Sequence, residues 1–386
     1  MKKHYMVLDS FRGICACIVA FSHFNANSIF YGSTLLDRGS PYVDFFFVLS
    51  GFIIFANYED KLRNGYSIKK FMLLRLGRLY PLHFAVLMAF ILVDVLQLFI
   101  NIGGASLYPP FSAPGETPSA ILAMLFLVHS LHITEILAFN GPSWSISTEF
   151  YAYLLFAVII SYSGKYCRSI LGLIIITMPV LLYFCYGELY AKLDYGFLRC
   201  IYGFACGALT WQFYRQHHEN IYNKLIAMRL ITALEIAVIT IVAIYIAYFS
   251  FNIGSFFAPI IYSAVILLFS FEAGKLSKFL QAKFFLLLGT LSYSIYMVHL
   301  FISGKFFALP IRLLENKLGW NLTVHSGEMQ LYGTNLVYGT LFEFFYLGVV
   351  VACSYISYKL IEQPFRNLTR KLVHKKPKHP SEEGAP

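Results

Sequence analysis

Long apolar runs separated by short polar stretches dominate this chain up to about residue 360. A helix of about 20 apolar residues is long enough to cross the hydrocarbon core of a bilayer. The pattern predicts ten membrane-spanning helices, over residues 8–27, 43–58, 79–100, 144–162, 168–186, 196–213, 229–249, 256–271, 284–303 and 338–360. We therefore expect an all-α polytopic membrane protein.

One further apolar run extends from Ser119 to Leu137, and the distribution of charge decides whether it is a span. An eleventh span here would move every later loop to the opposite side of the membrane. With ten spans, most Lys and Arg residues fall on one side of the membrane, including the group between Lys61 and Arg78 and the tail from Lys359 onward. Such an excess is typical of cytoplasmic loops. Both termini are therefore predicted to be cytoplasmic. The run from Ser119 to Leu137 becomes a re-entrant or interfacial segment in one long external loop.

The amino-acid composition also indicates a membrane protein, and the net charge bears on which partners are expected. The chain is 58% apolar and only 13% charged, which excludes an ordinary soluble globule. Its net charge of +10 is mostly the cytoplasmic excess that contacts anionic membrane lipid, so no nucleic-acid partner is expected. We expect one transmembrane domain over residues 1–366, followed by a basic, disordered cytoplasmic tail over residues 367–386. The first apolar run retains charges and lacks a cleavage site, which indicates a retained span.

The first span carries two ionisable residues, Arg12 and His23. They are eleven positions apart, which is almost three helical turns, so both project from one face about 16 Å apart. Ionisable groups in a bilayer are costly unless they face a protein-lined cavity. The spacing therefore predicts a polar path from one side of the membrane toward its middle.

Six strings in order resemble one family, the acyltransferase family 3 of bacterial membrane O-acyltransferases. They are LDSFRGICACIVAFSHF, VDFFFVLSGFII, RLGRLYPLH, GPSWSISTEFYAYL, LGTLSYSIYMVHLF and EQPFR, from Leu8 to about Arg366. The resemblance implies a multi-pass protein of the bacterial inner membrane. It also implies an activity, transfer of an acyl group, usually acetyl, from cytoplasmic acyl-CoA to a carbohydrate hydroxyl. Acetyl-CoA is then the expected co-substrate.

Transfer of an acyl group to a hydroxyl needs a base near that hydroxyl, and His23 is the preferred candidate. The alternative is a histidine that hydrogen-bonds a neighbouring helix. An acyl-imidazole intermediate on His23 is a second chemical route that stays open. Arg12 is expected to contact the donor, and the alternative is a simple ion pair with Asp9, three residues earlier.

Arg75 and Arg78 lie one helical turn apart at the cytoplasmic start of the third span. Their planar guanidinium groups suit the phosphates of CoA, and the match to the family's paired arginines favours that role. Anchoring to lipid head groups is the alternative, and it is the role we expect for Lys69 and Lys70.

Two acidic residues at the external starts of spans are catalytic candidates, Glu149 and Asp44. Glu149 is expected to orient the His23 imidazole or to hydrogen-bond the sugar, although an acid that caps a helix N-terminus fits the same position. Asp44 has the same two interpretations.

Three further residues are secondary candidates. Trp144 offers a ring face for a sugar, and Ser147 lies beside it in the same string. His299 shares a helix face with Ser292 and Tyr296, which fits a structural hydrogen-bond network as well as a catalytic one.

No CxxC pair or His-x-x-x-His cluster occurs, so no metal site is expected. The alternative function is a transporter or flippase for a glycan or lipid-linked sugar, without covalent chemistry. Transporters often contain two related halves, and no convincing repeat is present here. The pattern identifies neither the acceptor sugar nor the oligomeric state.

Overall fold

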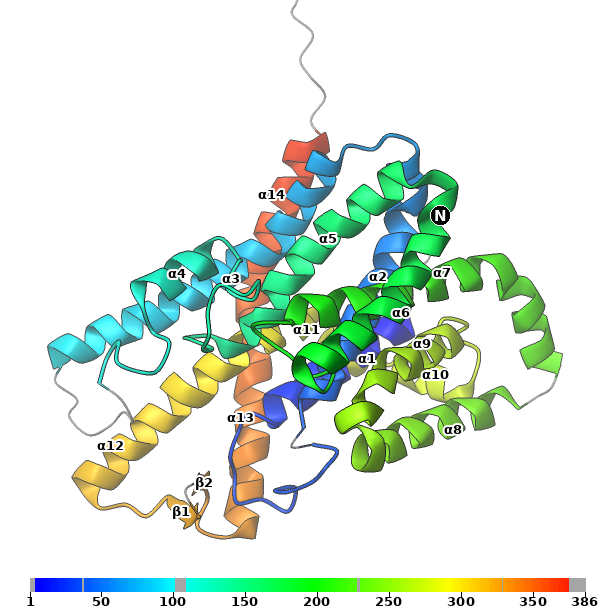
Figure 1. Ribbon diagram of the computed structural model, residues 1–386. Helices are drawn as coiled ribbons and strands as arrows, with labels where there is room; N and C mark the ends of the chain where they lie inside the picture. Colours follow the sequence, from blue (N-terminus) through cyan, green and yellow to red (C-terminus); the bar gives the residue numbers. More distant parts are fainter. Residues whose placement is uncertain (1–3, 37, 101–108, 228–229, 328, 375–386) are drawn as a thin grey trace, which may run out of the picture.

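The protein is a bundle of helices in a computed structural model that describes residues 4–36, 38–100, 109–227, 230–327 and 329–374 (Figure 1). Its α-helices are α1 (Met6–Phe21), α2 (Ser40–Arg63), α3 (Ile68–Ile100), α4 (Pro118–Leu125), α5 (Trp144–Tyr162), α6 (Cys167–Tyr186), α7 (Gly196–Ala227), α8 (Ile231–Ile244), α9 (Ala258–Phe269), α10 (Lys275–Leu280), α11 (Lys283–Phe301), α12 (Leu309–Leu318), α13 (Leu336–Ser357) and α14 (Gln363–His374).

Shorter elements join these helices. Three are 3-10 turns, η1 (Gly141–Ser143), η2 (Gly164–Tyr166) and η4 (Asn252–Phe257), and three are π-helical segments, η3 (Tyr245–Phe249), η5 (Ile302–Ala308) and η6 (Tyr358–Glu362). Two short strands, β1 (Thr323–Ser326) and β2 (Met329–Tyr332), form an antiparallel hairpin in which Thr323 pairs with Tyr332.

The predicted all-α polytopic class is confirmed. Within the described residues, eight helices are long and apolar enough to cross a membrane. Two predicted spans, 8–27 and 196–213, correspond to α1 and α7 and lie outside this set. α1 has only 16 residues and packs against α2, α11 and α13. A helix enclosed by other helices needs no continuous apolar surface toward lipid, which explains why α1 tolerates charged residues.

The segment 119–137 does not form a span. α4 ends at Leu125 after eight residues, and turns follow it as far as the start of α5. An eight-residue helix rises about 12 Å, too little to cross the hydrocarbon core. This geometry agrees with the predicted re-entrant or interfacial segment in the long loop between α3 and α5.

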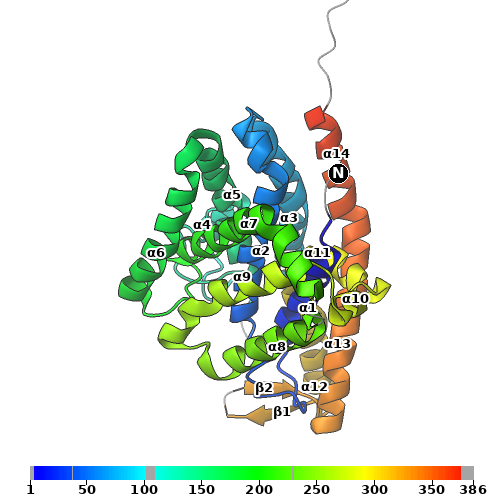
Figure 2. The same ribbon diagram turned by 90° about the vertical axis from the view of Figure 1, so that its right-hand side faces the viewer.

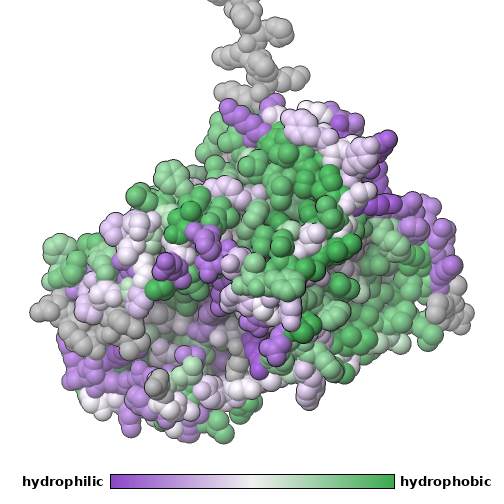
Figure 3. Space-filling view, viewed as in Figure 1, coloured by the Kyte–Doolittle hydropathy of each residue, from purple (hydrophilic) through white to green (hydrophobic). Residues whose placement is uncertain are grey.

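The bundle has two distinct ends. The first described residues and α14 lie toward one end, and the β1–β2 hairpin lies at the opposite end (Figures 1 and 2). We call these the terminus side and the hairpin side. Apolar side chains cover the broad middle of the face in Figure 3, and polar side chains gather toward its two ends. Such a band is expected where lipid surrounds the bundle.

The C-terminal helix extends beyond the predicted boundary of the transmembrane domain. α14 continues to His374, so residues 367–374 of the predicted disordered tail are helical. Residues 375–386 of that tail lie outside the described residues.

Glycines allow the central helices to approach closely. A Cβ atom placed on Gly13 of α1 would lie 2.4 Å from the backbone of Leu288 in α11. A Cβ on Gly51 of α2 would lie 2.0 Å from the carbonyl oxygen of Phe204 in α7, and one on Gly207 would lie 1.8 Å from that of Val48. The α1–α11 and α2–α7 pairs are also the most extensive helix contacts of the bundle. Small residues at helix interfaces are typical of membrane bundles.

Gly207→Leu is expected to lower stability, because its side chain would overlap the backbone of α2. Overpacking of this kind costs about 1–3 kcal/mol or more. Thermal unfolding of the detergent-solubilised protein measures the loss. Gly172→Leu in α6 is the matched control, because nothing lies within 4 Å of a Cβ there. Equal melting temperatures for the two variants would contradict the close α2–α7 contact.

Candidate active site

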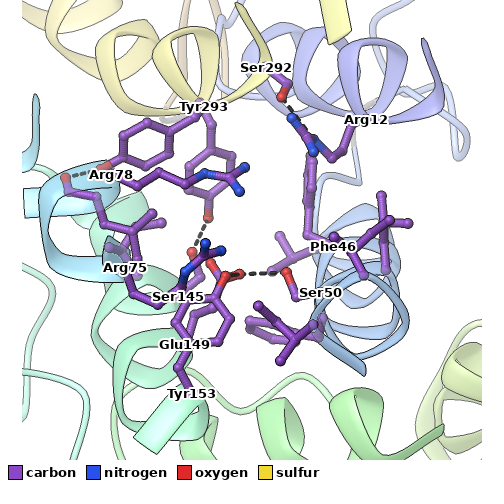
Figure 4. A pocket seen from close by; sticks show the side chains of 18 residues that line it. Arg12, Phe46, Ser50, Arg75, Arg78, Ser145, Glu149, Tyr153, Ser292 and Tyr293 are labelled. Carbon is purple, nitrogen blue, oxygen red and sulfur yellow. Dashed lines mark hydrogen bonds between the residues drawn. The ribbon is translucent and has the colours of Figure 1, made fainter. Parts of the chain in front are cut away.

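Three neighbouring cavities follow one another along the bundle. The terminus-side vestibule, of about 640 Å³, is lined by Tyr58, Lys61, Tyr66, Leu74, Arg75, Arg78, Arg366, Arg370 and His374. The central chamber is much smaller, about 80 Å³, and its polar lining is Arg12, Ser50, Arg75, Arg78, Ser145, Glu149, Tyr153, Ser292, Tyr293 and Tyr296 (Figure 4). The hairpin-side pocket, of about 690 Å³, includes His23, Arg38, Trp144, Tyr190, Lys192 and Tyr296.

Shared residues link these cavities into a series. Arg75 and Arg78 line both the vestibule and the central chamber. Val43 and Tyr296 line both the central chamber and the hairpin-side pocket. Tyr296 is held at this boundary, since its hydroxyl lies 2.8 Å from Ser145 Oγ and donates to the carbonyl oxygen of Pro142 at 3.0 Å. The polar path predicted from Arg12 and His23 thus has a structural counterpart, and these two residues line different cavities of the series.

Arg12 points from α1 into the central chamber. Its guanidinium donates to Ser292 Oγ at 3.2 Å and to the carbonyl oxygen of Gly289 at 3.3 Å, both on α11. It also lies 3.0 Å from a carboxylate oxygen of Asp9. Arg12 therefore forms the expected ion pair with Asp9 and also lines the chamber, while its contact with the donor stays a prediction. The close contact of Gly13 with α11 brings the two helices near enough for these bonds.

Arg75 and Arg78 project from α3 at the junction between the vestibule and the chamber. Arg75 donates to the Tyr58 hydroxyl at 3.2 Å, and its buried Nε has no hydrogen-bond partner among the described residues. No hydrogen bond from the Arg78 side chain is found in the described part of the chain, and the negative charges of Glu149 and Glu362 act on it. These guanidinium groups therefore keep donors available for an anionic ligand.

Glu149 lies on α5 and faces the central chamber (Figure 4). Its carboxylate accepts hydrogen bonds from Ser50 Oγ at 2.5 Å and from the Tyr153 hydroxyl. It does not line the hairpin-side pocket that contains His23. The structure therefore brings Glu149 together with the arginines of the chamber, and the predicted contact between Glu149 and the His23 imidazole is not seen.

His23 follows the end of α1 and is exposed to the hairpin-side pocket. Its Nδ1 lies 2.7 Å from the carbonyl oxygen of Val19. A carbonyl oxygen only accepts hydrogen bonds, so in the neutral ring Nδ1 carries the proton and Nε2 keeps its lone pair. Ser303 Oγ donates to the His23 carbonyl oxygen at 3.2 Å and holds the backbone. The imidazole is thus prepared to accept a proton at Nε2.

His299 lies against His23, with their ring centroids 5.0 Å apart. It is fully buried in α11, and its Nδ1 lies 3.3 Å from the carbonyl oxygen of Ile295. Its Nε2 is buried without a partner among the described residues. The predicted shared face of His299 with Ser292 and Tyr296 is therefore the face that α11 turns toward Arg12, the chamber boundary and His23.

Asp44 has a partner that the sequence analysis missed. Arg199 of α7 donates to both of its carboxylate oxygens, at 2.7 and 3.0 Å, and both side chains are fully buried. Arg199 also donates to the carbonyl oxygens of Ser40 and Ala191. Asp44 lines none of the three cavities. An arginine within the apolar run 196–213 was the available signal, because a charge in a span requires a partner.

Trp144 and Lys192 lie near this ion pair, and Ser147 has a different role. Trp144 lines the hairpin-side pocket, and the Arg199 guanidinium lies 5.2 Å from its ring centroid. Ser147 donates to the carbonyl oxygen of Leu127 at 2.5 Å, so it holds the loop between α4 and α5 and lines none of the three cavities. Lys192, in the loop before α7, lines the pocket, and burial together with the charge of Arg199 lowers its pKa.

Sequence comparison identifies one family over most of the chain. The sequence model described as an acyltransferase domain, of the acyltransferase family 3, matches residues 7–359. Its span contains every residue that lines the central chamber and the hairpin-side pocket.

Three bacterial proteins show partial similarity. The Streptomyces mycarofaciens protein named acyltransferase MdmB is 35% identical over 148 residues, which cover 37% of this chain and 34% of that protein. Protein 2 in the picA locus of Rhizobium radiobacter is 34% identical over 157 residues, covering 38% of this chain and 78% of that protein. An uncharacterized protein of Haemophilus influenzae is 31% identical over 143 residues, 35% of this chain and 55% of that protein. The match thus spans about a third of the first relative's length. No solved structure matches significantly.

Asp44→Asn is expected to destabilise the bundle by about 3–5 kcal/mol, because Arg199 would stay buried without a counter-charge. Asp60→Asn is the matched control. Asp60 pairs with Arg215 at 2.7 Å, but these side chains are 66% and 50% exposed, and exposed pairs contribute about 0–1 kcal/mol. Thermal unfolding in detergent compares the two. If Asp44→Asn lowered the melting temperature no more than Asp60→Asn does, the buried pair would not be important for stability.

Proposed function

The chain belongs to the acyltransferase family 3, and on that premise we propose that it transfers an acyl group, in the first place acetyl, from cytoplasmic acyl-CoA to a hydroxyl of a cell-surface or exported carbohydrate. The terminus side is then the cytoplasmic side of the bacterial inner membrane. The hairpin side faces outward, where the acceptor arrives. The observation that carries this proposal is the series of cavities from the Arg75–Arg78 junction to the free Nε2 of His23.

The shapes of the cavities suit two substrates that arrive from opposite sides. Arg75 and Arg78 hold phosphates of the donor, and the slender pantetheine arm of CoA extends through the narrow chamber. The thioester then lies near the boundary formed by Val43 and Tyr296, across which His23 lies. The wide hairpin-side pocket receives the sugar, with Trp144 as a ring face against which it packs.

The chemistry assigned to His23 is general base catalysis. Its Nε2 accepts the proton of the acceptor hydroxyl as the oxygen bonds to the thioester carbonyl carbon. The carbon–sulfur bond then breaks, and the imidazolium returns a proton to the CoA thiolate. The hydrogen bond from Nδ1 to the Val19 carbonyl supports this role, because it orients the ring and sets the tautomer.

Arg12 and Glu149 are assigned electrostatic roles in the chamber. The positive charge of Arg12 lies on the route of the donor, and Ser292 and Gly289 fix its position. Glu149 balances the arginines of the chamber through its fixed carboxylate, which Ser50 and Tyr153 orient. His299 supports His23 by ring contact. Asp44 acts at a distance, by holding Arg199 against the ring of Trp144.

Labelled acetyl-CoA separates this function from transport. The purified protein is incubated with acetyl-CoA, labelled in the acetyl group, and a mixture of bacterial glycans. An acyltransferase moves the label to a glycan and releases free CoA. A transporter or flippase leaves the label on CoA. That outcome, with a protein that is folded and intact, would overturn the proposal.

His23→Ala is expected to lower the rate of acyl transfer by about 10²- to 10⁴-fold, the usual contribution of a positioned base. Steady-state turnover of acetyl-CoA with a carbohydrate acceptor measures the change. His132→Ala is the control, because His132 is exposed, lies near Asp194 and lines none of the three cavities. A His23→Ala variant that is present at normal membrane levels and transfers acyl groups normally would remove His23 from the chemistry.

A further inference from the structure

The terminus-side vestibule is lined by an unusual excess of basic residues. Six of its lining residues are Lys61, Arg75, Arg78, Arg366, Arg370 and His374, and no acidic side chain of the described chain lines it. Its volume of about 640 Å³ lies within the range of pockets that bind small molecules, about 300–1,000 Å³. The composition indicates a site for a ligand with several negative charges.

In another cavity of the bundle, by contrast, the basic side chains form ion pairs. It has a similar volume, about 560 Å³, and is lined by Glu59 and Asp60 together with several cations. There Arg63 pairs with Glu59 at 3.0 Å, and Arg215 pairs with Asp60 at 2.7 Å. Within the described residues, none of the vestibule's Lys or Arg side chains forms an ion pair. Glu149 and Glu362 act on Arg78 from outside the cavity, and Glu362 also acts on Arg366. Lys61, Arg75 and Arg370 are therefore the vestibule cations that remain for a partner from outside the protein.

Helix α14 supplies half of these basic residues, and its position is set by a close contact with α3. A Cβ atom on Gly77 would lie 2.0 Å from Thr369 Oγ1, so only a glycine allows α14 to lie so near. The two helices run side by side in both views (Figures 1 and 2). Arg366 and Arg370 flank Thr369 and are one turn apart on α14, as Arg75 and Arg78 are on α3. Two pairs of guanidinium groups thus line one cavity.

The vestibule has an inner and an outer part. Arg75, Arg78 and Arg366 are half-buried, and Arg75 and Arg78 also line the central chamber. The buried Nε atoms of Arg75 and Arg366 have no hydrogen-bond partner among the described residues. Lys61 and Arg370 are exposed and lie at the outer part. A ligand with one anionic group beside the chamber and another farther out fits this arrangement.

We propose that the vestibule binds the nucleotide end of acyl-CoA, with its 5′-diphosphate at Arg75 and Arg78 and its ribose 3′-phosphate at Lys61 and Arg370. This inference rests on the proposed function and adds α14 as the element that recognises the nucleotide. The diphosphate is joined to the pantetheine arm, so it must lie at the entrance to the chamber. The 3′-phosphate is on the far side of the ribose, where Lys61 and Arg370 provide strong charge-assisted hydrogen bonds.

Tyr66 provides a half-buried aromatic ring in the same cavity, next to Tyr58 with ring centroids 6.3 Å apart. The Tyr58 ring already lies beneath Lys61 and Arg75. Tyr66 is therefore the ring on which we place the adenine.

The test compares acetyl-CoA with acetyl-3′-dephospho-CoA in a double-mutant design. For the unmodified protein in neutral detergent, loss of the 3′-phosphate is expected to raise KM by about 10- to 100-fold. Arg370→Gln and Lys61→Gln are each expected to raise KM for acetyl-CoA and to leave KM for the dephospho donor unchanged. The ratio of the two KM values therefore falls toward one, and kcat with either donor stays the same.

Lys69→Gln is the matched control, because Lys69 is an exposed cation of α3 outside the vestibule. Its KM ratio is expected to equal that of the unmodified protein. An unchanged ratio in both Arg370→Gln and Lys61→Gln would overturn the inference while acyl transfer continued. A protein that moves no acyl group from either donor would instead contradict the proposed function.

A lipid phosphate is the other source of the same chemistry, and a second arm separates it. The KM values are measured again in liposomes with and without anionic lipid. Nucleotide recognition predicts that the variants lose discrimination between donors in both membranes. If anionic lipid alone changes KM, and the variants remove that change while still discriminating between donors, then the vestibule binds lipid and the inference is wrong.

Discussion

A charge inside a bilayer needs a partner of opposite sign or contact with water, and this requirement organises the bundle. Asp44 and Arg199 satisfy it completely, as a buried pair that also binds backbone carbonyls of Ser40 and Ala191. Lys305 and Asp94 form a second, largely buried pair, between η5 and α3. Arg75 and Arg78 satisfy it differently, since they face cavities. Charged residues thus divide into those that hold helices together and those that line cavities.

This division gives the two ends of the bundle different chemical characters. Cations gather at the terminus side, a carboxylate and Arg12 face the narrow chamber, and an imidazole with a free nitrogen lies in the wide pocket beyond it. The two outer cavities have volumes of about 640 and 690 Å³, and the chamber between them has only about 80 Å³. Such an order suits a reaction whose two substrates come from different compartments. In the proposed function, this order keeps the nucleotide of the donor apart from the acceptor sugar.

Several features of the site were legible in the sequence because they are local. The placement of Arg12 in a polar cavity follows from one helix and its periodicity, and so does the shared face of Ser292, Tyr296 and His299. The different roles of Glu149 and Asp44 could not be predicted, because both are acids near the start of an apolar span. One faces the chamber and the other is neutralised by Arg199, which lies 155 positions away in the sequence. No local pattern distinguishes these two outcomes.

The sequence by itself determined that this chain forms apolar helices and which reactive groups it contains. It also determined at which ends of the helices the positive charge lies. Those properties arise from the transfer of each segment between water and lipid, and each segment carries that information alone. Only the tertiary structure decided which acid is paired, that the Val19 carbonyl sets the His23 tautomer, and that α14 joins the vestibule. Pairing depends on which helices approach closely, and such approaches, as at Gly13 and Gly77, combine segments that are far apart along the chain.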